Sequence, residues 1–149
     1  MKIKKTITFC SSASFFKQNL EVEKQLNALG FRVKLPYTAM KMKRSGDFRV
    51  ETYKTWFKDP KSYARKSWLI KNHFQKIISS DAILVLNYEK NGIDGYIGGN
   101  TLIEMAIAYH YKKPIYILNP VSEKLGFREE VLGLQPIFLN GKVENIKHA

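Results

Sequence analysis

Five short apolar segments, separated by longer stretches of mixed character, divide the chain. They are residues 2–9, 31–35, 81–87, 114–118 and 135–139. The segment from Asp81 to Asn87 is a nearly continuous apolar run bounded by polar residues. That pattern is typical of a central strand buried on both faces of a sheet. The sequence therefore predicts five strands, with the strongest signal at residues 81–87.

The stretches between these segments carry apolar residues at helical spacing. One predicted helix covers residues 15–29 and ends at Gly30, a residue suited to the C-terminal stop of a helix. A second covers 61–78, and its broad apolar face is expected to hold Ala64, Trp68, Ile70, Phe74, Ile77 and Ile78. A third covers 101–113. The basic and aromatic stretch 38–60 fits no regular pattern and is predicted to be a flexible lid or an insertion.

Alternating strands and helices favour one architecture. We expect a single α/β domain over residues 1–149, with a doubly wound, five-stranded parallel sheet of Rossmann-like or flavodoxin-like type. Right-handed crossovers would place helices on both faces of that sheet.

Positive charge is concentrated in the first half of the chain. Residues 1–80 hold 18 Lys and Arg against 5 Asp and Glu, whereas residues 81–149 hold 7 against 8, within a net charge of +12. A positive face attracts nucleic acid or an anionic metabolite. The same charges also suit an ordinary solvated surface, and composition does not choose between the two.

Cysteine content and hydropathy bear on the compartment. Cys10 is the only cysteine, so no intramolecular disulfide can form, and we expect a cytoplasmic protein. No window approaches the roughly 18 consecutive apolar residues of a membrane span, and no signal-peptide core follows the charged start, so no membrane partner is expected.

Ligands of an open parallel sheet bind at the carboxyl ends of its strands. Ser11, Ser12 and Ser14 follow the first strand, and their hydroxyls either contact a sugar or phosphate or simply suit a loop. Other candidate contacts at strand ends are Asn87, Tyr96 and Asn119. Cys10 adjoins this region and is a candidate ligand contact by position, and we expect a small buried thiol there and not a nucleophile.

The turn Gly98-Gly99-Asn100-Thr101 stands directly before a predicted helix. Paired glycines permit close approach of a ligand to the backbone, and free amides at a helix N-terminus favour a phosphate or carboxylate. Alternatively, Asn100 or Thr101 only caps the helix. The turn matches neither a dinucleotide fingerprint nor a P-loop.

Glu104 lies one turn into the same helix among apolar and small residues. A carboxylate in such surroundings is either an ordinary surface group or a chemically poised group that faces a cleft. Periodicity alone leaves both options open.

Three motifs together resemble the nucleoside 2-deoxyribosyltransferase superfamily, which includes the 2′-deoxynucleoside 5′-monophosphate N-glycosidases. They are Phe9-Cys10-Ser11-Ser12, the run 80–86, and the stretch from Gly99 to Tyr109 followed by Lys113-Pro114-Ile115. The resemblance extends over most of the chain, is weak over 38–60, and is strongest to a branch of small proteins with a Tyr-Ile-Gly-Gly-Asn-Thr turn.

The resemblance implies a mechanism without a cofactor, and no metal is expected because no cluster of Cys, His, Asp and Glu in the sequence has metal-ligand spacing. Glu104 would be the nucleophile that attacks the anomeric carbon of a nucleoside or nucleotide, in the manner of a retaining glycosidase. Two positions depart from the family pattern: His73 stands where an Asp is usual, and Gly98 where an Asp or Ser is frequent. His73 is a candidate proton donor or a packed residue. A homodimer or higher oligomer is expected, because sites of the family are commonly completed by a neighbouring subunit.

Three functions therefore remain open. The first is an N-glycoside hydrolase or transferase that acts on a nucleoside or nucleoside 5′-monophosphate. The second is a non-catalytic module of the same fold that senses or binds a nucleotide. The third, least favoured, is nucleic-acid binding through the cations and aromatic residues of segment 41–76.

Overall fold

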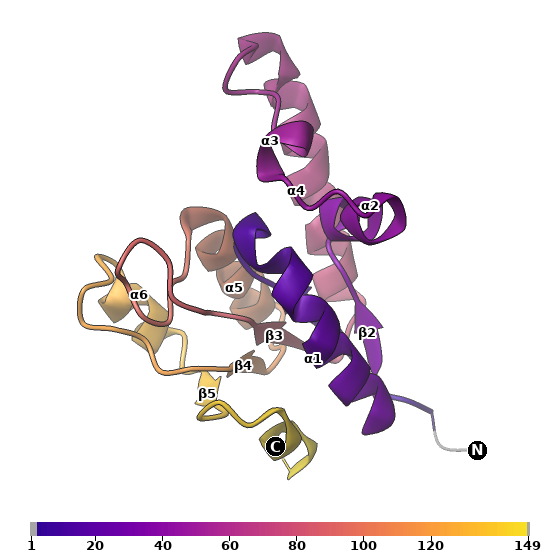
Figure 1. Ribbon diagram of the computed structural model, residues 1–149. Coiled ribbons are helices and arrows are strands. Elements are labelled where there is room, and N and C mark those ends of the chain that lie inside the picture. The colour runs from indigo at the N-terminus through magenta and orange to yellow at the C-terminus, as the bar shows by residue number, and fades with distance from the viewer. Residues whose placement is uncertain (1–2, 149) are drawn as a thin grey trace.

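The computed structural model describes residues 3–148. Its centre is a five-stranded parallel sheet with the strand order β2-β1-β3-β4-β5 (Figure 1). The strands are β1 (Thr6–Cys10), β2 (Arg32–Lys34), β3 (Ala82–Val85), β4 (Ile115–Ile117) and β5 (Ile137–Phe138). The predicted fold class is confirmed, and the run at residues 81–87 supplies the middle strand of the sheet.

Helices connect the strands. The α-helices are α1 (Phe16–Ala28), α2 (Tyr37–Ser45), α3 (Val50–Tyr53), α4 (Tyr63–Ile78), α5 (Gly99–His110) and α6 (Arg128–Gly133). Short 3₁₀ helices are η1 (Ala13–Phe15), η2 (Pro60–Ser62) and η3 (Val143–His148). Helix α1 stops where Gly30 adopts a positive φ of 94°, as its position in the sequence predicts.

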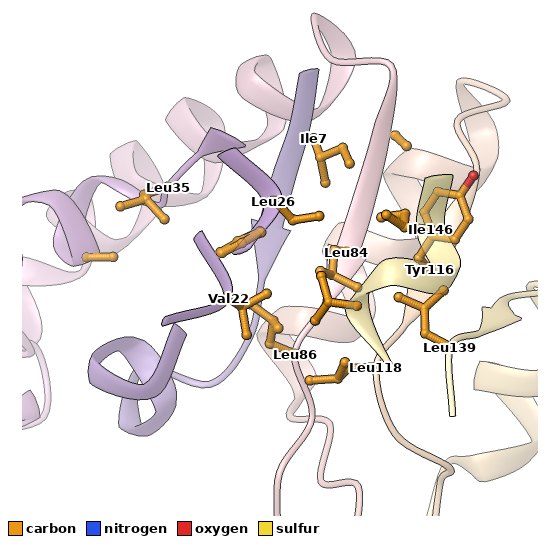
Figure 2. Close-up of a cluster of buried hydrophobic side chains, with 14 of the residues drawn as sticks. Ile7, Val22, Leu26, Leu35, Leu84, Leu86, Tyr116, Leu118, Leu139 and Ile146 are labelled. Atoms are coloured by element: carbon orange, nitrogen blue, oxygen red, sulfur yellow. The ribbon is translucent and has the colours of Figure 1, made fainter. Parts of the chain in front are cut away.

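The side chains of the strands alternate between two apolar clusters, one on each face of the sheet. Ile7 and Leu84 point to the face covered by α1, α2 and η3, whereas Ile83 and Val85 point to the face covered by α4, α5 and α6. Figure 2 shows the first cluster, in which Val22 and Leu26 of α1 gather near Leu84. Burial on both faces explains why β3 is apolar at every position.

The stretch 38–60 is more regular than its sequence indicates. It contains most of α2 and all of α3, which the prediction of a flexible lid missed. Ala39 and Met42 of α2 are buried, so this helix contributes to the core, and the role of the stretch as a lid or an insertion stays a prediction. Figure 1 shows α3 and the first turns of α4 extending away from the sheet as an arm.

The predicted apolar face of α4 is correct only near its C-terminal end. Ile77 is fully buried, but Trp68 is 44% exposed, because the first half of α4 lies in the arm beyond the sheet. Helix α6 and the 3₁₀ helix η3 were not predicted. Among the described residues, none of the helices has both the length and the apolar character that crossing a bilayer requires.

Candidate active site

A pocket of about 230 Å³ opens where β1 and β3 end side by side. This is the point at which the strand order reverses, since β2 lies on one side of β1 and β3 on the other. Its wall combines the loop after β1, the turn before α5, and residues of α4 and the arm. The sequence-predicted residues that line it are Ser11, Ser12, His73, Tyr96, Gly98, Gly99, Asn100, Thr101 and Glu104.

The glycine turn presents the N-terminus of α5 to this pocket. Gly98 is the N-cap residue, and no side chain caps the helix. The first amides of a helix have no partner within the helix, so they remain free to donate to a ligand. A Cβ added at Gly99 would meet no atom within 4 Å, and the side chain of Asn100 accepts a hydrogen bond from Lys66 Nζ at 3.1 Å. Capping by Asn100 or Thr101 is therefore not the role of this turn.

Glu104 lies one turn further along α5, on the side of the helix that faces the pocket. Only 4% of the residue is exposed. Burial raises the pKa of its carboxyl group to about 8, and the nearby Lys66 partly opposes this rise. The structure thus places Glu104 in the cleft beside Ser11 and Ser12, and its carboxyl group is mostly protonated at neutral pH.

His73 projects from α4 to the same point. Its Nε2 lies 2.9 Å from the carbonyl oxygen of Phe9 and 3.3 Å from Oε2 of Glu104. Burial, followed by the positive charge of Lys76, lowers the pKa of His73 to about 4, although the contact with the Phe9 carbonyl raises it. The ring is therefore neutral at pH 7, and because Nε2 faces a carbonyl oxygen, Nε2 carries the proton and donates it.

Cys10 completes a buried cluster with His73 and Glu104. Its Sγ lies 3.6 Å from His73 Nε2, and burial, assisted by Glu104, raises the pKa of the thiol well above its usual value. These three residues are the one group in the described part of the chain whose possible metal ligands lie within 4.8 Å of one another. Since Nε2 donates to Phe9, its lone pair is not available to a cation. The geometry fits a hydrogen-bonded cluster, and the absence of a metal stays a prediction.

The serines after β1 have different surroundings. Ser11 is buried, with its hydroxyl accepting from Asn19 at 2.8 Å and donating to the Ser12 carbonyl at 3.0 Å. Ser12 accepts from Lys90 Nζ at 3.0 Å at the pocket wall. Ser14 is exposed and does not line the pocket. Ser12 is therefore the serine best placed for a ligand.

Asn87 and Asn119 are not brought to the pocket. They hold two strand ends together, because the side-chain amide of each donates to the other's backbone carbonyl, at 2.8 Å and 2.9 Å. The Asn87 side-chain oxygen also accepts from the Asn119 backbone amide. Their polar groups are used within the fold, and the sequence signal of an Asn after a strand did not distinguish this structural role from ligand binding.

Three pocket residues were missed by sequence reasoning as specific contacts. Lys54 follows α3, Lys66 belongs to α4, and Lys90 lies in the loop after β3. Trp56 also lines the pocket and is 4% exposed. The Nζ atom of Lys66 lies over its indole ring, 5.3 Å from the ring centre. For Lys54, Lys66 and Trp56 the sequence signal was the general excess of cations and aromatic residues before residue 80, and no sequence signal pointed to Lys90.

The two shifted pKa values predict a pH dependence of stability. In the unfolded chain Glu104 loses its proton above its ordinary pKa of 4.5, whereas in the folded protein it keeps the proton up to about pH 8. The free energy of unfolding therefore falls as the pH rises from about 4.5 to about 8. His73 has the opposite effect on stability. Between about pH 4 and its ordinary pKa of 6.5, the unfolded chain holds the proton that folded His73 has lost, so the free energy of unfolding rises with pH. From pH 6.5 to 8 His73 no longer opposes the Glu104 effect, and we expect this effect to lower the free energy of unfolding by up to about 2 kcal/mol.

Urea unfolding at several pH values in this range measures that loss. Glu104→Gln carries no titrating group at this position, so its free energy of unfolding is expected to change less with pH than that of the unmodified protein. Equal slopes for the two proteins would show that the buried carboxyl group does not hold its proton.

Comparisons with known proteins bear on the fold. No protein-family profile matches the sequence, and a comparison with curated proteins also finds no match. Among solved structures, a 2-deoxyribosyltransferase from Bacillus psychrosaccharolyticus matches over 97% of this chain and 91% of its own, with 16% identity and a TM-score of 0.59. The flavoenzyme FerB from Paracoccus denitrificans, an NAD(P)H:acceptor oxidoreductase, matches over 91% and 75%, with 16% identity and a TM-score of 0.47. At 16% identity the match to the 2-deoxyribosyltransferase shows a shared fold. The family resemblance is thus supported for the fold.

Proposed function

We propose that this protein cleaves the N-glycosidic bond of a nucleoside or nucleoside 5′-monophosphate, and that the carboxylate of Glu104 is the nucleophile. One observation carries the proposal: Glu104 is buried in a pocket at the switch point of the sheet, one turn beyond the free amides of the Gly98–Thr101 turn. The fold shared with a 2-deoxyribosyltransferase supports the same chemistry. A residue with a strongly shifted pKa in a cleft is a frequent mark of a catalytic group.

The proposed reaction has two steps. An oxygen of Glu104 forms a bond to the anomeric carbon while the bond from that carbon to the base nitrogen breaks, and the departing base takes up a proton from water. The resulting glycosyl ester is then resolved by water, which gives hydrolysis, or by a second base, which gives transfer. None of these steps requires a cofactor.

Glu104 must lose its proton before it can attack. Its burial opposes ionisation, whereas the positive charge of Lys66 favours it. The Nε2 atom of His73 lies 3.3 Å from Oε2, so its one N–H, which donates to Phe9 at 2.9 Å, can be shared with the carboxylate as a second, longer hydrogen bond that holds the carboxylate in place. Because the pKa of His73 is about 4, the ring carries no spare proton at pH 7, and we assign it a positioning role in preference to that of a charged acid.

This requirement predicts the pH dependence of the rate. Across a panel of nucleosides and 5′-monophosphates, we expect release of free base, with kcat increasing up to about tenfold between pH 6.5 and 7.5, because the ionised fraction of a group with a pKa of about 8 rises by that factor. Chromatographic detection of the free base measures the rate. If Glu104 were instead a general acid, the rate would fall over the same range.

The second candidate is a nucleotide-binding module without turnover. Its support is that His73 and Gly98 stand where the resembling enzymes carry acids or a serine. Calorimetry on the same panel separates the two functions. Saturable binding with no release of base from any member would favour the binding module and overturn the proposed catalysis.

The expectations about domain organisation, oligomeric state and cellular compartment remain predictions. They are that residues 1–149 work as one domain, that the protein forms a homodimer or higher oligomer, and that it resides in the cytoplasm. Nucleic-acid binding through segment 41–76 stays the least favoured prediction: Trp56 is buried and the Trp68 ring packs edge-on against Tyr37, whereas Phe57 and Tyr63 are exposed.

A further inference from the structure

Three lysines from separate segments converge on the pocket. Lys54 comes from the arm, Lys66 from α4, and Lys90 from the loop after β3. Each is partly buried, unlike most lysines of this chain, which lie exposed on the surface. Burying an ammonium group is unfavourable unless an anion or a set of acceptors compensates it. Their convergence therefore needs an explanation.

Two of the lysines are held in fixed positions. Lys66 donates to Asn100 in the glycine turn at 3.1 Å, and its ammonium group lies over Trp56. Lys90 donates to Ser12 at 3.0 Å, and its Nζ lies 5.2 Å from the centre of the Tyr96 ring. Aromatic faces support a cation in such geometry and leave its remaining N–H groups free. The two ammonium groups are thus anchored to the turn before α5 and to the loop after β1.

The lysines have no matching negative charge. Within residues 3–148, none of the carboxylates lies within 4.0 Å of the ammonium group of Lys54, Lys66 or Lys90. The pKa of Lys54 is lowered by burial and then by repulsion from Lys66 and Lys90. Glu104, the one acid that the described residues contribute to the pocket wall, is mostly protonated at neutral pH. The pocket therefore offers several cations and free helix amides to an anion that the described part of the chain does not supply.

We propose that Lys54, Lys66 and Lys90 form a phosphate subsite, and that the ligand of this pocket is a nucleoside 5′-phosphate and not a free nucleoside. As a statement about substrate, this inference rests on the proposed function, whereas the subsite itself does not. Phosphate oxygens would accept hydrogen bonds from the ammonium groups and from the amides of Gly99 and Asn100. The sugar would then lie between this subsite and Glu104.

Binding measurements test the subsite without any need for turnover. Isothermal titration of inorganic phosphate, and of four 2′-deoxynucleosides with their 5′-monophosphates, compares the unmodified protein with Lys54→Met, Lys66→Met and Lys90→Met. Methionine keeps an apolar stem against the neighbouring rings, which limits any loss of folding. The control is Lys71→Met, on the same helix as Lys66 but exposed.

We expect at least one 5′-monophosphate to bind about tenfold or more tightly than its nucleoside, because charged hydrogen bonds are the strong ones. Each pocket variant is expected to lose most of that preference and to weaken the binding of inorganic phosphate, whereas Lys71→Met is expected to retain both. Equal affinity for nucleosides and monophosphates, or an unchanged preference in all three pocket variants, would overturn the subsite. Phosphate-dependent binding without base release would leave the subsite standing and contradict only the proposed catalysis.

Discussion

Glu104→Gln is expected to reduce kcat for release of free base by at least about 10³-fold, because an amide cannot form the ester through which a nucleophilic route proceeds. Glutamine has nearly the same size, so the pocket should keep its shape. The change also removes a group whose ionisation is unfavourable in the buried site. Ligand affinity is therefore expected to change far less than the rate, and parallel calorimetry and chromatography measure the two quantities.

The matched control is Glu130→Gln on α6. Glu130 is exposed and lies outside the pocket, so its replacement makes the same chemical substitution without altering the site. This control is expected to release base at the rate of the unmodified protein. Turnover that survives Glu104→Gln would exclude Glu104 as the nucleophile, even if the protein proved to be a glycosidase.

His73→Ala is expected to lower kcat by about 100-fold, which corresponds to the loss of a hydrogen bond to a charged group. The change removes the N–H group beside Glu104 Oε2 and leaves the carbonyl of Phe9 without its donor. Because the ionised form of Glu104 loses a stabilising neighbour, the midpoint of the pH–rate profile is also expected to move upward from about pH 8.

The leaving group distinguishes positioning by His73 from proton donation. If His73 holds Glu104, the loss should be similar for nucleosides with good and poor leaving bases. His73→Gln, whose amide is able to donate to Phe9, should then recover part of the rate. A loss confined to poor leaving bases, with no shift of the pH midpoint, would instead identify His73 as the general acid.

The fold could be predicted because its strands are unusually clear in the sequence. Burial on both faces forces β3 to be apolar at every position, and a positive φ explains why a glycine follows α1. The stretch 38–60 could not be assigned, because α2 is short and rich in cations and only two of its residues, Ala39 and Met42, are buried. Its helical structure depends on packing against α1 and α4.

The candidate site was predictable in part for a similar reason. Glycines before a helix follow a local pattern, so Gly98 could be proposed from spacing, whereas Glu104 became a catalytic candidate only through the family resemblance. The contact between His73 and Glu104, and the meeting of Lys54, Lys66 and Lys90, join segments far apart in the chain. Long-range contacts of this kind leave no periodic signal. The same limit explains why Asn87 and Asn119 seemed to be ligand contacts when they bind each other.

The formation of a bond between Glu104 and the sugar is the central claim, and peptide mass spectrometry tests it most directly. The protein is quenched in acid during turnover of the best substrate in the panel and then digested. The account predicts that the peptide containing Glu104 carries the added mass of one glycosyl group, and that Glu104→Gln treated identically carries none. Rapid release of base with the glycosyl group on another residue, or with no adduct at any quench time, would contradict it.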